Sequence, residues 1–446
     1  MTSTPTKQTP TTRNELDRAL AITSSRTWDA DRRMPLVPDR GQGAHFWDSA
    51  GQEYIDLTSC TGAAPLGMGH APVLNAVIDE MRRSGGVLPG VMSSLRTDVA
   101  QDLCSVFPCA QRALFFRTGS CATSGAVRLA RVHTGRDLIL TSGFHGWHDW
   151  QLQYKGTPDV VGRDAGVVDF GYDIERLRTL LESHPGRVAA VFVTPESTCM
   201  PLADLFTMQD LARSHGALFA LDEVMTGFRF LNGGLHGALG LSPDLITVSK
   251  GLCNGMALSA VLGARSVLEA HEKTYLGNTF MREVAPFAGA RVSVELQRGG
   301  GIQTIIDHVS RLVPGINAAF GRHGLAARAL SAAGIFHVLF EDDDLGQRFY
   351  TQLRRRGVHA EFGGAHLVSA ALTPDDIDQA VLTFDEVAAT FAGPSAASIS
   401  PEAFARFAGD AFRVTPPVAA RWWEQLGPRL DTATTDAGAT LVGRSA

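Results

Sequence analysis

The sequence lacks the features that mark a membrane-spanning or secreted protein. Its 446 residues include no apolar run of about 18 residues, the length that a membrane-spanning helix requires. The first residues, 1–13, are rich in Thr and Pro and have no apolar stretch of the kind found in signal peptides. We therefore expect a cytoplasmic protein with a disordered start.

Cysteine is also scarce, and its spacing indicates neither a disulfide framework nor a metal site. The chain has six cysteines and no CxxC pair, so reduced thiols are expected. His145 and His148 stand close together, but no cysteines or carboxylates around them have a recognisable zinc spacing. We interpret these histidines as loop or core residues and predict no bound metal.

Charge of one sign is not concentrated anywhere in the chain. The net charge of -6 comes from mixed residues without long runs, so neither nucleic acid nor an anionic membrane is an expected partner. A small-molecule substrate fits this composition better. With 44% hydrophobic residues the chain can bury a sizeable core, and its length predicts more than one domain.

Hydrophobic patterning divides the chain into five regions. After the disordered start, residues 14–85 are predicted to be an N-terminal segment with a short β-meander at HFWD and EYIDL. Residues 86–313 form the large domain, where short apolar runs alternate with helical stretches, which is typical of a mainly parallel sheet covered by helices. Residues 314–394 are predicted to be a small α+β domain, and residues 395–446 a helical extension.

The individual elements are predicted from the same pattern. Six apolar runs are expected to be strands of the large sheet: residues 113–116, 137–141, 188–193, 217–222, 245–249 and 260–264. In the small domain, IFHVLF and HLVSAAL are predicted to be strands. A helix is expected to begin at Thr373-Pro374 and to stop at Gly393-Pro394, and PEAFARFAGDAF is a further helix.

Chemically suggestive residues follow three of these strands. Gly119 and Ser120 open a helix after the first, where free amides and the helix dipole favour an anion. Asp222 ends another strand, where it could keep a cofactor's pyridine nitrogen protonated, and Lys250 follows a third, where it could form a Schiff base. Taken singly, each has a simpler interpretation: a turn, a helix-capping aspartate and a solvated lysine.

The order of these motifs resembles that of the class-III aminotransferases, especially the glutamate-1-semialdehyde aminomutase branch. The anion cup is followed by Phe144-His145-Gly146, then by Asp222-Glu223-Val224, and 28 residues after Asp222 by Lys250. The resemblance covers roughly residues 35 to 390 and rests on several motifs at matching spacings. It implies an α/β enzyme of fold type I that depends on pyridoxal 5′-phosphate (PLP).

The same resemblance implies roles for individual residues. Lys250 would hold PLP as an internal aldimine and shuttle a proton at the reacting carbon, and Asp222 would face the pyridine nitrogen. The other implied contacts are Gly119 and Ser120 at the phosphate, Phe144 and Val224 on the two faces of the ring, and Thr279 at the phosphate of the neighbouring subunit. The last of these implies a homodimer.

The chain departs from the family at Cys121, where relatives commonly have a glutamate. Thr194-Pro195 also stands where Glu-Pro is common, which puts the usual handling of glutamate-type amino donors in doubt. Once a proton has left the substrate, its return to the cofactor gives transamination. Its return to the substrate from the opposite face gives epimerisation and needs a second acid. Cys121 is a candidate for that acid, and a small packing residue is the alternative.

Within this branch, the chain is similar to the C6′ aminotransferases and the aminoepimerase of aminoglycoside antibiotic pathways, notably gentamicin. The similarity implies an amino-sugar substrate. We predict epimerisation at C6′, with Lys250 and Cys121 acting on opposite faces. Ser93, Arg96 and His145 are further candidates for contact with the substrate.

Other functions stay open at this point. An aminotransferase would use the same Lys250 and Asp222 but would require a keto-acid acceptor, and an amino-migrating mutase is a third possibility. A nicotinamide-dependent enzyme could be argued from residues 234–240, although their glycine spacing is not GxGxxG and no strand precedes them. A non-catalytic binding protein would be expected to lack the lysine or the aspartate.

Overall fold

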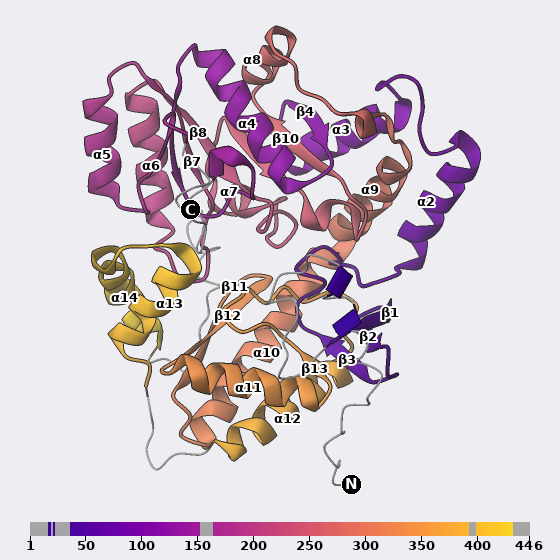
Figure 1. Cartoon of the computed structure of the whole chain (residues 1–446), viewed down its shortest axis with the longest axis vertical. Coiled ribbons are helices and arrows are strands. Elements are labelled where there is room, and N and C mark those ends of the chain that lie inside the picture. Colours follow the sequence, from indigo (N-terminus) through magenta and orange to yellow (C-terminus); the bar gives the residue numbers. More distant parts are fainter. Residues whose placement is uncertain (1–16, 19–20, 23–35, 152–163, 392–397, 431–446) are drawn as a thin grey trace.

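The largest sheet of the protein has seven strands (Figure 1). The computed structural model describes residues 17–18, 21–22, 36–151, 164–391 and 398–430. The strands are β4 (Arg112–Phe116), β5 (Leu138–Ser142), β6 (Val167–Asp169), β7 (Val188–Val193), β8 (Leu218–Asp222), β9 (Leu245–Val248) and β10 (Ser259–Gly263). Their order is β4-β10-β9-β8-β7-β5-β6. The pairs from β9 to β6 are parallel, and β10 runs antiparallel to both of its neighbours. The predicted mainly parallel sheet, with all six predicted strands, is confirmed.

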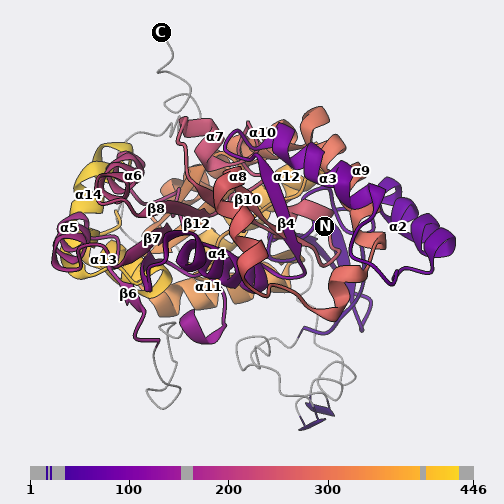
Figure 2. The same ribbon diagram turned by 90° about the horizontal axis from the view of Figure 1, so that it is seen from above.

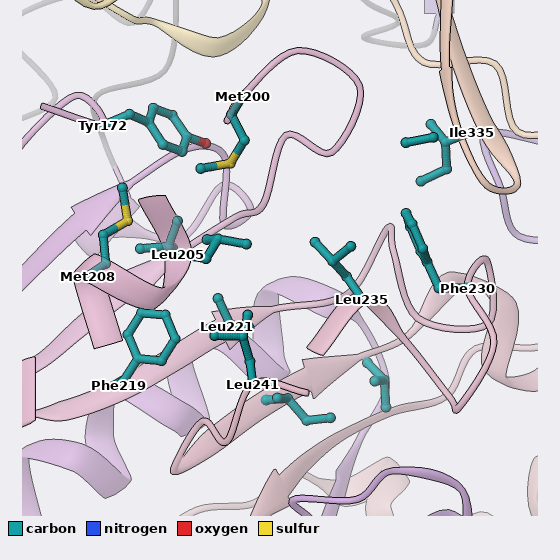
Figure 3. Packing of buried hydrophobic residues seen from close by; sticks show 14 of the residues in the cluster. Tyr172, Met200, Leu205, Met208, Phe219, Leu221, Phe230, Leu235, Leu241 and Ile335 are labelled. Carbon is teal, nitrogen blue, oxygen red and sulfur yellow. The ribbon is translucent and has the colours of Figure 1, made fainter. Parts of the chain in front are cut away.

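Helices cover both faces of this sheet. One face carries α4 (Gly119–Thr134) and α8 (Arg265–Leu268). The other carries α3 (Ser94–Val106), α5 (Ile174–Ser183), α6 (Ala203–Ser214) and α9 (Ala285–Leu296). Successive residues of β7 alternate between the two faces: Phe192 packs under α4, and Val191 and Val193 pack on the other side. Figure 3 shows part of the larger cluster, from Tyr172 and Met200 at one end to Ile335 at the other.

The N-terminal segment forms a separate four-stranded sheet with a distant part of the chain. β1 (Pro38–Gln42), β2 (His45–Asp48) and β3 (Glu53–Asp56) pair antiparallel in sequence order. β13 (Val358–His359) then pairs parallel with β3. The helix that follows β3, α2 (Ala71–Ser84), packs against α9 instead. The N-terminal segment therefore contacts both the large sheet's helices and the C-terminal part of the chain.

The region after the large sheet is a hairpin packed on helices. The hairpin is β11 (Ala327–Ala332) and β12 (Ile335–Phe340), and the helices are α10 (Ile302–Arg322), α11 (Asp343–Arg355) and α12 (Pro374–Thr390). α12 begins where it was predicted: Thr373 accepts from the Asp376 amide, and Asp376 accepts from the Thr373 amide at 2.8 Å. Gly393 and Pro394, which were predicted to stop this helix, lie outside the described residues.

The predicted strand HLVSAAL, residues 366–372, is wrong. Beyond one isolated bridge to β12, its backbone groups bond to separate segments: the Leu367 amide donates to the Leu57 carbonyl, and the Ala370 amide donates to the Pro65 carbonyl. No ladder forms along this stretch. The apolar run instead reflects burial, because the segment crosses between the N-terminal region and the hairpin.

The C-terminal helices dock against the large domain. α13 (Pro401–Phe412) coincides with the predicted helix PEAFARFAGDAF, and α14 (Pro416–Leu430) follows it. Figures 1 and 2 both show this pair beside α5 and α6. Trp422 is fully buried with its ring 5.4 Å from that of Tyr172, and Arg421 forms a two-bond ion pair with Asp204 on α6, at 3.0 and 2.7 Å. The tail is therefore part of the folded core.

Three further findings concern the described part of the chain. None of its helices combines the length and the hydropathy needed to cross a bilayer. No group of three or more His, Cys, Asp or Glu side chains is arranged there to hold a metal ion. All six cysteines are free thiols.

Candidate active site

A pocket of about 390 Å³ lies at the carboxyl ends of the central parallel strands. Loops that leave neighbouring parallel strands converge at this edge, which is where α/β sheets bind ligands. Seven of the residues proposed from sequence line the pocket together: Lys250, Asp222, Gly119, Ser120, Phe144, His145 and Val224. Four different strand exits supply them, so the site exists only in the folded chain.

Lys250 follows β9 as the first residue of a 3₁₀ turn, Lys250–Cys253. Asn254 ends this turn in the left-handed conformation, and its side chain ties the turn to the backbone of Leu66 and Gly67 at 2.8 and 2.9 Å. Burial lowers the pKa of the Lys250 amine, although the Asp222 carboxylate opposes the shift. The neutral amine, which forms Schiff bases and accepts protons, is thereby favoured.

Asp222 is the last residue of β8 and is held by three donors. One carboxylate oxygen accepts from the Thr247 hydroxyl at 2.9 Å and the Val224 amide at 3.1 Å. The other pairs with Nδ1 of His145 at 3.0 Å. The buried His145 ring stacks on Phe192 with the centroids 4.5 Å apart. His145, considered from sequence for substrate contact, therefore orients Asp222.

The start of α4 has the geometry of an anion cup. Thr118 caps the helix by accepting from the Cys121 amide at 3.2 Å, so the Gly119 and Ser120 amides precede the first intrahelical bond. Gly146 lies over this turn with φ 108°, and a side chain there would strike Ser120. Gly119, Ser120 and Gly146 all line the pocket, and free amides at the start of a helix are suited to a phosphate.

Four residues singled out from sequence do not line the pocket. Cys121 packs against the apolar cluster under α4, and its sulfur accepts from the Thr118 hydroxyl at 3.2 Å. Thr279 is exposed. Ser93 caps α3, and Arg96 donates to two backbone carbonyls. Within one protomer, none of these four is positioned to contact a molecule in the pocket.

Two further pocket residues follow β7: Thr194, noted from sequence only as a departure from the family, and Glu196, which the sequence analysis missed. Thr194 and Glu196 both line the pocket, and Glu196 is only 5% exposed. Burial raises the pKa of Glu196 to about 8, with Asp222 adding to the rise and Tyr172 and Lys250 opposing it. Glu196 stands three residues beyond the apolar strand 188–193, so a search for acids in the segments after apolar strands would have found it.

One wall of the pocket comes from outside the central sheet. His337 of β12 lines it, bonded to the Thr198 hydroxyl at 2.8 Å, and burial lowers the pKa of His337 to about 3, so it is neutral. Ala411 and Phe412 at the end of α13 complete this wall. Sequence patterning carried no signal for this wall, because it depends on how the C-terminal helices dock.

The glycine-rich stretch at residues 234–240 has a structural role. It forms the short helix α7 (Leu235–Leu239), whose first two amides donate to the Glu223 carboxylate at 2.7 and 3.0 Å. A side chain at Gly234 would collide with that carboxylate. Because Glu223 fills the helix N-terminus, this stretch has no place for a dinucleotide phosphate, which removes the basis of the nicotinamide alternative.

The donor set fits PLP. A buried carboxylate with three donors suits a pyridinium partner, the amides that open α4 suit a phosphate, and an amine of lowered pKa suits a Schiff base. Val224 packs against Gly119, where a Cβ would lie 3.0 Å from its methyl group, and both face the pocket. Phe144 lines the pocket from the loop after β5.

Comparison with known proteins agrees with this geometry. The family described as aminotransferase class-III matches residues 28–160 and 170–371. The 2′-deamino-2′-hydroxyneamine transaminase of Streptomyces kanamyceticus is 34% identical over 351 residues, which cover 78% of this chain and 89% of that protein. The glutamate-1-semialdehyde 2,1-aminomutase of Neisseria gonorrhoeae (strain FA 1090) is 30% identical, covering 84% of this chain and 98% of that protein.

Solved structures share the fold. The PLP internal aldimine form of the FumI protein of Sphingopyxis sp. MTA144 superposes with a TM-score of 0.79 at 27% identity, covering 85% of this chain and 96% of that one. The β-phenylalanine aminotransferase of Variovorax paradoxus superposes with a TM-score of 0.77 at 25% identity, covering 84% and 93%. The matched family, the fold and the pocket agree, and the chain belongs to the class-III aminotransferases, PLP-dependent enzymes of fold type I.

Proposed function

We propose that this enzyme binds PLP through Lys250 and labilises the C–H bond at an amine-bearing carbon of an aminoglycoside amino-sugar. The observation that carries the proposal is that a partly buried lysine of lowered pKa and a triply bonded aspartate line one pocket. The amino-sugar rests on the similarity to the neamine-type transaminase, which is 34% identical.

The residues of the pocket divide the chemistry between them. When bound, PLP supplies an electron sink for the pair left by the broken C–H bond. Asp222 holds a proton at the ring nitrogen, and His145 keeps the aspartate in place. Gly119 and Ser120 bind the phosphate through backbone amides, and Lys250 takes the proton from the substrate carbon.

Two outcomes share this first step. Return of the proton to the cofactor side gives transamination, which agrees with the relative's name and needs a keto-acid acceptor. Return to the substrate from the other face gives epimerisation at C6′, for which Cys121 was the predicted acid. Cys121 stands outside the pocket lining, so the geometry supports transamination better than epimerisation through Cys121.

We further propose that the enzyme works as a homodimer in which Thr279 completes the neighbour's phosphate site. Thr279 is exposed in the protomer, and Phe280 and Tyr275 beside it are 62% and 78% exposed. Large apolar side chains exposed next to one another commonly mark an interface. Sedimentation equilibrium measures the assembly state, and Thr279→Ala is expected to weaken PLP binding without changing that state.

The function can be tested with one labelled reaction. The PLP-loaded protein is incubated in deuterated water with an aminoglycoside that carries its amine on a secondary C6′ carbon, with and without an α-keto acid. NMR and mass spectrometry then follow that carbon. Carbonyl formation that depends on the keto acid indicates transamination, whereas deuterium uptake with inversion and no acceptor indicates epimerisation.

The Lys250→Ala protein is the blank for this reaction. It is expected to lose the absorbance of the lysine-bound cofactor and to slow exchange by at least about 100-fold, because the proton acceptor is gone. Wild-type protein that exchanges no deuterium at C6′ and forms no carbonyl would refute the substrate assignment. A Lys250→Ala protein that exchanges as fast as wild type would refute the role of the lysine.

A further inference from the structure

Three consecutive strands of the sheet each deliver one ionisable side chain to the pocket. Lys250 comes from the end of β9, Asp222 from β8 and Glu196 from β7, and these strands are neighbours in that order. Lys250 and Glu196 therefore follow the two strands that flank β8. In the proposed function, Asp222 is the partner of the pyridine nitrogen. Glu196 has no role in that function.

The surroundings of Glu196 favour the protonated carboxyl. The Tyr172 hydroxyl lies beside it but already donates to the Thr194 carbonyl at 2.8 Å. Its interaction with Glu196 lowers the pKa of the carboxyl, but burial has the larger effect and raises that pKa. A buried, uncharged acid also avoids the desolvation cost of a carboxylate.

Four titratable groups act on Glu196 or are acted on by it. They are Lys250 and Asp222 in the pocket, the Tyr172 hydroxyl after β6, and the Cys199 thiol in the same loop as Glu196. Burial raises the pKa of both the tyrosine and the cysteine, so both are neutral near pH 7. The negative charge of Asp222 raises the pKa of Glu196, and Lys250 lowers that pKa only while its amine is protonated. The local charge balance therefore does not force Glu196 to ionise.

We propose that Glu196 is the second proton carrier of the site, which protonates the amine-bearing carbon of the substrate after Lys250 has deprotonated it. The inference rests on the proposed function and deepens its epimerisation outcome. It transfers to Glu196 the role that sequence reasoning gave to Cys121. Glu196 lines the pocket and Cys121 does not.

The step balances without an added reagent. Lys250 takes up the proton as the substrate C–H bond breaks, and the electron pair stays with the substrate and its bound cofactor. The O–H bond of Glu196 then breaks, its proton forms the new C–H bond, and its electron pair remains on the carboxylate. Lys250 ends as an ammonium and Glu196 as a carboxylate, and proton exchange through solvent restores both. Nothing is oxidised or reduced overall.

A substrate labelled with deuterium at the reacting carbon separates the two proton transfers. In ordinary water, wash-out of the label reports the Lys250 step, and inverted product reports the Glu196 step. For Glu196→Gln we expect wash-out within a few-fold of wild type and inversion slower by about 100-fold or more. The matched control is Glu361→Gln, because the Glu361 charge also acts on Lys250 but its side chain does not line the pocket. Both rates should stay within a few-fold in that control.

A second measurement reads the proton on Glu196 without catalysis. Denaturant unfolding of wild type and Glu196→Gln, each without PLP, is followed from about pH 5 to about pH 8. The folded state keeps the Glu196 proton over a range where the unfolded chain, with an ordinary pKa of about 4.3, has lost it. Wild type should therefore lose stability relative to the variant as the pH rises. A difference that stays constant with pH would contradict a protonated Glu196.

The outcomes for the inference and for the proposed function are distinct. No wash-out with wild type refutes the proposed substrate and with it this inference. Wash-out with transamination but no inverted product in wild type overturns the role of Glu196 and leaves the aminotransferase function standing. Inversion by Glu196→Gln at the wild-type rate overturns it as well. Inversion lost in Glu196→Gln but kept in Glu361→Gln supports it.

Discussion

Adjacent acidic residues after β8 have different tasks because successive side chains at a strand end point to opposite sides. Asp222 turns toward the pocket, and Glu223 turns away from it into the core. There Glu223 pairs with Nδ1 of His236 at 2.6 Å and accepts from the Thr226 hydroxyl at 3.0 Å. The pair fixes α7 against β8 and so steadies the strand end that carries Asp222.

This buried pair predicts how stability depends on pH. Burial alone would lower the pKa of His236, but the Glu223 carboxylate, with a smaller contribution from Cys109, raises it to about 10, and His236 in turn lowers the pKa of Glu223. The pair therefore stabilises the fold near neutral pH. That contribution is lost as the pH rises through about 10 and His236 loses its proton, and again in acid as Glu223 gains one.

Glu223→Gln should remove the contribution of this pair to the pH dependence of stability. We expect it to cost about 3 to 5 kcal/mol at neutral pH, because His236 would stay buried without a charged partner. Its unfolding free energy should also change less than that of wild type between about pH 8 and pH 10. Denaturant unfolding at several pH values measures both effects. Asp137→Asn breaks an exposed pair with Arg187 and should leave stability almost unchanged, because water screens that pair.

Some site residues could be predicted from sequence because strand exits are visible in the pattern. Lys250 and Asp222 each follow an apolar run, and motif order linked them to one cofactor. The partners that orient Asp222 could not be predicted in the same way, because His145 reaches it across 77 positions of sequence. Glu196 was not predicted, because the family resemblance gives a role to the position of Thr194 and none to the position of Glu196.

At the scale of elements, α12 shows how much a single cap contributes. Thr373 and Asp376 bond reciprocally at its start, which satisfies two amides that the helix leaves unpaired. Thr373→Ala is expected to lower the unfolding free energy by about 1 kcal/mol. Thermal or denaturant unfolding measures the loss. Thr179→Ala, at an exposed position within α5, should change it by less than about 0.5 kcal/mol.

The elements also show where patterning fails. Alternation and turn residues located the six longer strands of the large sheet, but not the three-residue β6 or the two-residue β13. Such short strands form because a neighbouring strand, β5 for β6 and β3 for β13, supplies backbone groups for them to bond to. HLVSAAL failed for the opposite reason: its apolar residues are buried by tertiary crossing, and burial without a pairing partner leaves the same composition as a strand.

At the scale of the whole molecule, the C-terminal helices join the core to the pocket wall. Trp422 is fully buried against Phe412 and Tyr172, and Phe412 lines the pocket. Trp422→Ala should lower the unfolding free energy by about 3 to 5 kcal/mol. It should raise KM for the amino-sugar more than it lowers kcat, since no proton-transfer group is on these helices.

Steady-state kinetics and denaturant unfolding test this prediction together. Trp147→Ala is the control, because Trp147 is 71% exposed and should be replaced with little effect on stability. A fall in kcat for Trp422→Ala with an unchanged KM would contradict the idea that these helices shape the substrate wall. Retained absorbance of the bound cofactor would show that the cofactor site itself is intact.

The residues that match the class-III family end at 371, whereas Ala411 and Phe412 lie well beyond that point. Changes in α13 and α14 can therefore alter which substrates bind without changing a residue that transfers a proton. Chimeras built at the α12–α13 junction would test whether exchanging these helices between enzymes of one reaction changes the substrates that they accept.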